Sequence, residues 1–384
     1  MLGTDTIPDS YFEDFVNLKS IDLTKYKHIG ANAFKNTGLS TLTIPNSVIS
    51  VGKGAFSNCN QLKTVEIKSS LELIPDSLFA NCSYLETVKI PTTIEEIGAN
   101  AFSNCTNLSS LNEWSSIRRI NNFSFENCKK LKGITLNEIV YLGENALSGC
   151  NLSNELIFSI QASYAQNALN NVTGVKSITI NCDFFSENIE FYLGNTTSLI
   201  TQITISNVSE LNEGYFNNCS NVESIIISGD IKTIGKDSFG GLTKLVQISL
   251  PDSIEAIKEF AFKGCSNLTE VNMPTNIKVI EKYAFYDCIN LSSIELINNI
   301  EYIGKQAFNE NTKVDNSEDV HQIHKADWHK NWDSQRPVTF MTVMEDIYDF
   351  IIKNYLMIII CSASLVIGVT VLIIIKKVKK HRKK

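Results

Sequence analysis

Histidine is scarce in this sequence, and most of the chain has no cluster of basic residues. Only five of the 384 residues are histidine, and one of them, His28, precedes residue 321. Before residue 321, a Ser/His or Cys/His catalytic pair could therefore use only His28. Residues 376–384 hold seven of the 34 Lys and Arg residues, which leaves 27 basic against 41 acidic residues, a net charge of −14, before this tail. This acidic body excludes nucleic acid as a partner, because binding to phosphates requires clustered Lys and Arg.

Three familiar sequence signals are also missing. The N-terminus has no basic segment followed by an apolar run, so no secretory signal peptide is visible. The chain has ten cysteines but no Cys-x-x-Cys pair of the kind that binds zinc. The stretch from Gly229 to Gly235 resembles a phosphate-binding loop, but five residues separate these glycines where four are needed, and Asp237 replaces the Ser or Thr that would hold the metal. We therefore expect no catalytic centre, cofactor or metal, and we do not expect an enzyme.

The sequence does contain a repeat of about 23 residues. Residues 44–67 align without a gap with residues 250–273, and each unit reads Ile-x-x-Ile-Gly, Ala-Phe-x-Asn-Cys and Leu-x-x-Val-x-Ile-Pro. The last part alternates like a half-buried strand. A unit this short cannot bury its apolar side alone, so successive units must stack around one continuous core. The anchor of each unit falls at Phe12, Phe34, Phe56, Phe79, Phe102, Phe125, Leu147, Leu169, Tyr192, Phe216, Phe239, Phe262, Phe285 and Phe308.

This pattern predicts an α/β-type repeat solenoid of the leucine-rich-repeat kind, with about 14 units of about 23 residues in residues 1–312. Two stretches depart from it, residues 111–116 and residues 152–191. In the second, the Ala-Phe anchor changes to Ala168-Leu169 and then to Phe191-Tyr192. We expect the solenoid to bend or to carry a modified coil there.

The Ile-Gly, Ala-Phe, Asn-Cys and Leu-x-x-Val-x-Ile-Pro elements at this period resemble the BspA-like leucine-rich-repeat surface proteins of bacteria and mucosal protist parasites. The resemblance covers about four fifths of the chain. It implies a cell-surface antigen that takes part in adhesion to host cells or extracellular matrix. The periodicity itself indicates only the architecture.

Eight of the ten cysteines occupy one position of the repeat, which Val172 or Leu242 fills in other units. We therefore predict a column of buried thiols that pack as small apolar side chains. In-register side chains on parallel neighbouring coils have poor disulfide geometry. The eight are Cys59, Cys82, Cys105, Cys128, Cys150, Cys219, Cys265 and Cys288.

The C-terminal part predicts a membrane anchor. Residues 354–375 carry no charge over 22 positions, which as a helix would span about 33 Å, enough for a hydrocarbon core of about 30 Å. The basic residues 376–384 follow at once, so the positive-inside rule places this tail in the cytoplasm. Residues 313–353 are expected to be a juxtamembrane stalk. The stalk histidines His321, His324 and His329, together with Asp327, have the side chains that bind metals, but a polar, aperiodic segment is more typical of a linker.

Two sets of candidate site residues follow from the repeat. Outward-pointing strand residues would form a concave face suited to extended protein recognition, or a merely solvated surface. This face would contain Asp22, Thr43, Glu66, Lys89, Thr135, Thr179, Thr204, Ile226, Ser249, Asn272 and Glu295. N-glycosylation sequons, which fit an exposed ectodomain but which the Asn-Cys-x-Asn-Leu-Ser/Thr pattern also generates by itself, occur at Asn81, Asn104, Asn107, Asn122, Asn151, Asn171, Asn195, Asn207, Asn218, Asn267 and Asn290.

The sequence thus favours a single-pass plasma-membrane protein whose repeats are extracellular and bind a protein ligand such as host matrix or a cell-surface protein. Two alternatives remain. One is an intracellular scaffold with a tail anchor, suggested by the absent signal peptide and the free thiols. The other is a surface-coat or immune-decoy antigen without a specific ligand. The charge bias around residues 354–375 argues against the first alternative.

Overall fold

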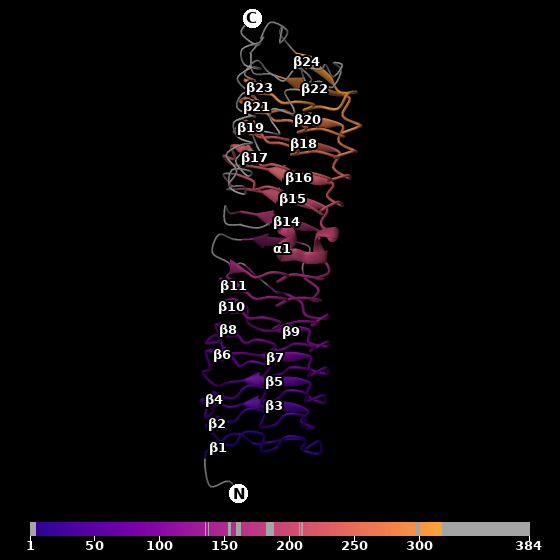
Figure 1. The fold of residues 1–384 in the computed structure, drawn as a ribbon. Coiled ribbons are helices and arrows are strands. Elements are labelled where there is room, and N and C mark those ends of the chain that lie inside the picture. Colours follow the sequence, from indigo (N-terminus) through magenta and orange to yellow (C-terminus); the bar gives the residue numbers. More distant parts are fainter. Residues whose placement is uncertain are drawn as a thin grey trace, which may run out of the picture. The chain divides into compact units, whose positions relative to one another are not determined.

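The computed structural model describes residues 5–316, except for residues 135, 137, 153–154, 159–162, 182–187, 207, 209 and 297–299. These residues belong to one compact unit, Met1–Ser334. They form a parallel β-solenoid of about 13 turns of ~23 residues. Figure 1 shows the short strands of successive coils stacked above one another in two columns.

The first strand column consists of the Leu-x-x-Val-x-Ile segments. Its strands pair in parallel and in register, so that Leu42 lies opposite Val65, which lies opposite Val88. These inward side chains are buried, and the residues between them face outward. The sheets of this column are β3 (Thr41–Ile44), β5 (Thr64–Ile67), β7 (Thr87–Lys89) and β9 (Ser110–Leu111); β12 (Glu155–Phe158), β14 (Ser177–Ile180), β15 (Gln202–Ile205) and β16 (Ser224–Ile227); β18 (Gln247–Ser249) and β20 (Glu270–Asn272); and β22 (Ser293–Leu296) and β24 (Lys313–Asn316).

The second strand column consists of two-residue strands at the Ile-x-x-Ile-Gly segments, also paired in parallel. A glycine follows six of these strands and allows close contact between coils there; the six are Gly30, Gly52, Gly98, Gly143, Gly235 and Gly304. A Cβ added at Gly235 would lie 1.7 Å from the carbonyl oxygen of Leu211, so any side chain would clash there. The strands are β1 (Thr6–Ile7), β2 (His28–Ile29) and β4 (Ser50–Val51); β6 (Leu73–Ile74), β8 (Glu96–Ile97), β10 (Arg119–Ile120), β11 (Tyr141–Leu142) and β13 (Ser163–Tyr164); and β17 (Thr233–Ile234), β19 (Ala256–Ile257), β21 (Val279–Ile280) and β23 (Tyr302–Ile303).

The third side of each coil is the Ala-Phe-x-Asn-Cys segment, which we call the turn side. Two positions flanking the anchor have positive φ, as at Asn100 (57°) and Asn104 (61°) around Phe102. Asparagine tolerates this left-handed conformation better than most residues. Backbone groups still pair between coils, since the Phe79 N–H donates to the Ala101 carbonyl at 2.8 Å. The asparagine of Asn-Cys is therefore a backbone requirement of the coil.

The core is a column of stacked aromatic rings inside the coils. Ring centroids of neighbouring anchors lie 5.1 Å apart for Phe34 and Phe56 and 6.0 Å apart for Phe56 and Phe79, with nearly parallel planes. The rings are fully buried. Each coil supplies one anchor to the core, an aromatic ring in all coils except those of Leu147 and Leu169. The apolar surface that one unit cannot bury alone is thus covered by its two neighbours.

The expected α/β character is wrong for the described residues. They contain one α-helix, α1 (Ile189–Leu193), and one 3-10 helix, η1 (Gly194–Leu199). In the other coils, residues with positive φ lie before and after the anchor on the turn side. A right-handed helix needs negative φ at every residue, so no helix forms there. The helices fall in the unit whose anchor is Phe191-Tyr192, at the end of the stretch predicted to carry a modified coil, and the Asn188 side chain caps α1 by accepting from the Phe191 N–H at 3.1 Å.

The number of turns and the end of the solenoid also differ slightly from expectation. About 14 units are expected and about 13 turns are observed, which equals the 13 steps between the fourteen anchors. Strand β24 lies in the first four residues of the segment expected to be a stalk, where it pairs with β22 in register. No helix within the described residues is long and apolar enough to cross a membrane. The predicted span 354–375, the tail 376–384 and the stalk after residue 316 lie outside the described residues.

Candidate functional site

The structure places most of the predicted face residues on the outward side of the first strand column, which we call the strand face. Thr43, Glu66 and Lys89 lie side by side in one register row. Further along, Thr179 pairs with Thr204 and Ile226 continues that row. The remaining pairs are Ser249 with Asn272 and Glu295 with Asp315.

Two members of the predicted set stand apart. Asp22 lies outside the strands, and its carboxylate accepts hydrogen bonds from the Thr24 N–H at 2.9 Å and from the Thr24 hydroxyl at 2.7 Å. These bonds lower the pKa of Asp22. Thr135 lies outside the described residues. The row is therefore built by the coils from residue 41 onward.

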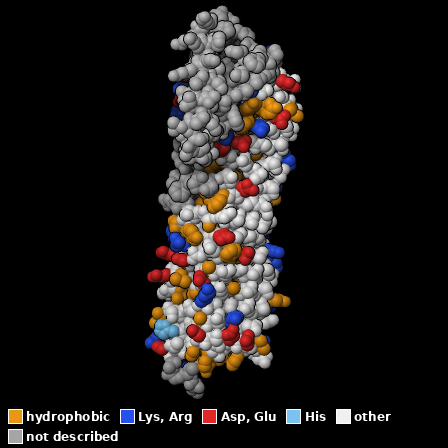
Figure 2. All heavy atoms as spheres, in the orientation of Figure 1, with side chains coloured by type: hydrophobic (Ala, Val, Ile, Leu, Met, Phe, Trp, Pro, Cys, Tyr) orange, Lys and Arg blue, Asp and Glu red, His pale blue; other side chains and the backbone are white. Residues whose placement is uncertain are grey.

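The strand face is chemically mixed. The Glu66 carboxylate pairs with Lys68 of its own coil at 3.2 Å, whereas Ile226 is 48% exposed. Figure 2 shows charged side chains of both signs and hydrophobic side chains scattered over the visible surface of the described residues. Such a surface offers many weak polar contacts over several coils, which suits an extended partner better than a small ion.

The turn side carries an asparagine ladder that the sequence analysis did not foresee. The Asn81 Nδ2 donates to the Asn58 Oδ1 at 3.0 Å, the Asn104 Nδ2 to the Asn81 Oδ1 at 2.9 Å, and the Asn127 Nδ2 to the Asn104 Oδ1 at 2.9 Å. The ladder explains why a polar residue recurs at a partly exposed position. The recurring Asn in the sequence was the signal for it.

Several sequons take part in such contacts. Asn107 donates to the Ser83 carbonyl at 2.7 Å, Asn195 to the Asn171 Oδ1 at 3.2 Å, and Asn218 to Glu190. Asn122 instead accepts from the Glu144 N–H at 3.0 Å. Asn207 lies outside the described residues. Glycosylation at all eleven positions stays a prediction.

The predicted column of buried thiols is confirmed. All eight cysteines are free and buried. Most of them donate from Sγ to the carbonyl oxygen of the anchor of the previous coil, as Cys105 does to Phe79 at 3.1 Å. Burial raises the pKa of Cys150 and of Cys219 to about 12. Burial therefore keeps these two thiols neutral, as packing groups rather than nucleophiles.

Thr196 occupies the position of this column in the helical coil, which the sequence analysis missed. Its hydroxyl donates to the Leu169 carbonyl at 2.8 Å and accepts from the Val172 N–H at 3.1 Å. The insertion of one residue shifts Thr196 out of the repeat spacing. The shift explains why spacing alone could not find it.

Histidine and acidic residues form no metal-binding group of three or more among residues 5–316 as described. The His28 Nδ1 lies 2.8 Å from the Ser50 hydroxyl on the next coil, within the second strand column. His321, His324, His329 and Asp327 lie outside the described residues.

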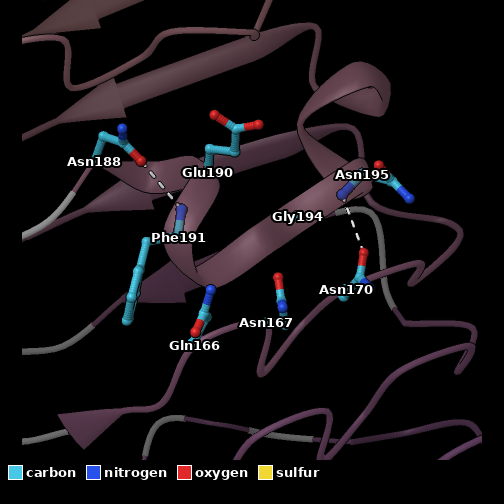
Figure 3. A pocket seen from close by; sticks show the side chains of 8 residues that line it. All are labelled: Gln166, Asn167, Asn170, Asn188, Glu190, Phe191, Gly194 and Asn195. Carbon is cyan, nitrogen blue, oxygen red and sulfur yellow. Dashed lines mark hydrogen bonds between the residues drawn. The ribbon is translucent and has the colours of Figure 1, made fainter.

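The helical coil also forms an open pocket of about 410 Å³. Figure 3 shows Gln166, Asn167 and Asn170 pointing from one coil toward α1 and Gly194, with Asn188 and Phe191 at one end and Asn195 at the other. A Cβ added at Gly194 would lie 2.5 Å from the Asn170 Oδ1, so glycine permits the close approach. We call the depression the amide pocket. The decay of the Ala-Phe anchor was the signal that marked this stretch, but it did not reveal the pocket.

The stacked parallel strands, the phenylalanine column and the asparagine turns define a leucine-rich-repeat β-solenoid. Sequence profiles of the BspA type leucine rich repeat region match residues 5–132, 106–223 and 209–325. The chain belongs to this family of BspA-type leucine-rich-repeat proteins. Leucine-rich-repeat domains generally bind proteins.

Solved leucine-rich-repeat structures are also similar to the chain. A protein from Bacteroides ovatus is 25% identical, over 82% of this chain and 75% of that one, with a TM-score of 0.49. A leucine-rich cell surface protein from Faecalibacterium prausnitzii is 20% identical, over 84% and 85% of the two chains, with a TM-score of 0.38. No curated protein matches the chain.

Proposed function

We propose that this protein is a membrane-anchored surface protein that displays its leucine-rich-repeat solenoid for adhesion to host cells or extracellular matrix, without catalysis. Residues 354–375 would cross the plasma membrane once, with the tail in the cytoplasm and the repeats outside. The ligand would be a protein of the matrix or of another cell surface.

The observation that carries the proposal is the register of the strand face. Equivalent outward residues of successive coils lie in line, for example Thr43, Glu66 and Lys89. Parallel strands in one sheet lie about 4.8 Å apart, so a partner that contacts one coil can contact the next with little further loss of freedom. Weak contacts added in this way give useful affinity without a deep pocket.

The adhesion arm is tested with full-length protein displayed on cells that do not otherwise bind matrix. The variant T43A/E66A/K89A should lower attachment to surfaces coated with fibronectin, fibrinogen or laminin about tenfold, because it removes three neighbouring polar side chains of the row. A matched control, K53A/E72A/T92A, changes the same residue types at exposed positions outside the strand face. If both variants attach like the wild type, the strand face is not the adhesive site.

The topology arm is tested by staining intact cells with an antibody to the repeats and an antibody to the tail. The proposal requires repeat signal without tail signal before permeabilisation, and both signals after it. Repeats that stain only after permeabilisation would contradict surface display and favour the intracellular scaffold.

A further inference from the structure

The amide pocket contains hydrogen-bonding groups that the fold does not use. Among the residues that the structure describes, the side-chain amides of Gln166 and Asn167 have no protein partner. Asn170 uses its Oδ1 to accept from the Asn195 N–H at 3.0 Å, and Asn188 uses its Oδ1 to cap α1. The NH₂ groups of Asn170 and Asn188 are then still available as donors. Several amides thus converge on one depression with spare capacity.

The charge of the lining narrows the ligand class. No lining residue is basic, so phosphate, sulfate and carboxylate groups would find no counter-charge. Glu190 is the one acidic lining residue, and its Oε2 already accepts from Asn218 of the next coil at 2.6 Å. A metal ion would need several carboxylate or carbonyl oxygens directed at one point. The lining therefore selects a neutral ligand.

The hydrogen-bonding groups and the aromatic ring of the lining narrow the ligand class further. Amides both donate and accept, so neighbouring amides can satisfy adjacent hydroxyl groups whatever their orientation. The half-buried Phe191 ring, which packs edge-on against Tyr192 at 5.1 Å, adds an apolar surface at one end. A pyranose ring has hydroxyls around its edge and an apolar C–H face. A volume of about 410 Å³ lies within the range of small-molecule sites.

From these features we propose that the amide pocket binds a neutral sugar, such as a terminal hexose of a glycan. Gln166, Asn167, Asn170 and Asn188 would hydrogen-bond its hydroxyl groups, and Phe191 would lie against its C–H face. The pocket is lined by Gln166, Asn167 and Asn170 of one turn side and by residues of the segment 188–195 around α1, whereas the strand face is formed by the first strand column. Sugar binding would therefore be independent of the matrix contact proposed above.

The test uses full-length protein purified from a bacterial host, so that no N-linked glycan is attached to Asn195, in a detergent without a sugar headgroup. The immobilised protein is probed with polyacrylamide polymers carrying galactose, mannose, glucose or N-acetylglucosamine, and with a sialic acid polymer. We expect at least one neutral polymer to bind and to be displaced by the same free monosaccharide, whereas the sialic acid polymer should not bind.

The decisive variant is Gln166→Ala with Asn167→Gly. Asn167 has a φ of +57°, which glycine adopts without strain, so the side chain can be removed without disturbing the coil. Loss of two hydrogen-bonding side chains should weaken polymer binding about tenfold. Glu144→Ala with Asn145→Gly is the matched control, because these residues hold the same places one coil earlier, where φ at Asn145 is +50°. This control should bind like the wild type.

A second variant guards against an effect on folding. Asn188→Asp keeps an N-cap acceptor for α1 but replaces the amide donor by a carboxylate, and it should also weaken binding. The proposal is overturned if no neutral polymer binds, if only the anionic polymer binds, or if the Gln166/Asn167 variant binds as well as its control.

Discussion

The coils on either side of the middle of the solenoid differ from the coils within it. Between Phe34 and Phe125 the anchor rings stack at 5.1 to 6.0 Å, and from Phe216 to Phe308 they stack again at 4.9 to 5.6 Å. Between these blocks the anchors are Leu147, Leu169 and Tyr192. The regular coils thus keep a continuous column of stacked phenylalanine rings, and the middle coils interrupt it.

Polar contacts change in the same place. In the first block Asn58, Asn81, Asn104 and Asn127 bond to one another along the turn side. In the middle, Gly149 takes the ladder position and ends this series, and Asn171 accepts from Asn195 at 3.2 Å. Asn167, two residues before its anchor, has no side-chain partner among the described residues. Regular coils after Phe216 also lack the ladder asparagine, since Gly241 and Gly264 take its position. What distinguishes the middle is that the chain there forms α1 and leaves amides free around a pocket. Regularity stabilises the solenoid, and its interruption creates a site.

The largest expected effect is on the phenylalanine column. Phe102→Ala should lower the free energy of unfolding by about 3–5 kcal/mol, because it leaves a cavity between two buried rings. Leu169→Ala should cost about 1 kcal/mol less, since leucine is smaller and its neighbours do not stack. Solenoids can unfold in parts, so amide hydrogen exchange should be followed by segment together with urea denaturation. Equal losses would mean that ring stacking adds nothing beyond side-chain burial.

The next effect is alkaline destabilisation by the thiols that flank the middle coils. Burial raises the pKa of Cys150 and of Cys219 to about 12 in the folded protein, whereas an unfolded thiol titrates near about 8.5. Above that pH the unfolded chain loses protons and the folded chain does not. The stability is therefore complete below the unfolded pKa and falls as pH rises toward 12, by up to about 1.4 kcal/mol per pH unit for each thiol.

Other groups also titrate in this range, so the measurement is a difference between two proteins. Denaturant unfolding at pH 7.5 and pH 10 is compared for the wild type and for C150V/C219V, with valine chosen because Val172 fills this position naturally. The variant should lose clearly less stability between the two pH values. The same loss in both proteins would show that these thiols do not stay neutral in the fold.

The regular coils could be predicted from sequence because every element recurs. The alternation in the Leu-x-x-Val-x-Ile segment predicts a half-buried strand, and a glycine after Ile recurs where neighbouring coils touch. The thiol column followed from the in-phase cysteines and from the apolar residues that replace them. These arguments depend on repetition, so they apply from residue 30 to residue 150 and again beyond residue 210.

The helical coil and its pocket could not be predicted in the same way. The anchor change at Phe191-Tyr192 indicated an irregularity, but one extra residue moved Thr196 out of register and hid its role. Gln166 and Asn188 line one pocket only through the path of the chain at α1, a tertiary arrangement without a sequence period. The α/β expectation failed for a different reason: residues with positive φ recur on the turn side, and a right-handed α-helix does not accommodate them.

The smallest effect tests the asparagine ladder directly. Asn104 and Asn167 both have positive φ, +61° and +57°, so glycine replaces either without backbone strain. Asn104→Gly removes two side-chain hydrogen bonds of 2.9 Å, to Asn81 and from Asn127, and should lower the free energy of unfolding by about 1 kcal/mol. Asn167→Gly removes none and should change it by less than about 0.5 kcal/mol. The added unfolded-state freedom is the same in both variants, so the difference between their denaturation midpoints isolates the ladder. Equal midpoints would mean that asparagine recurs on the turn side only for its left-handed backbone, and that the contrast between regular and middle coils comes from the core alone.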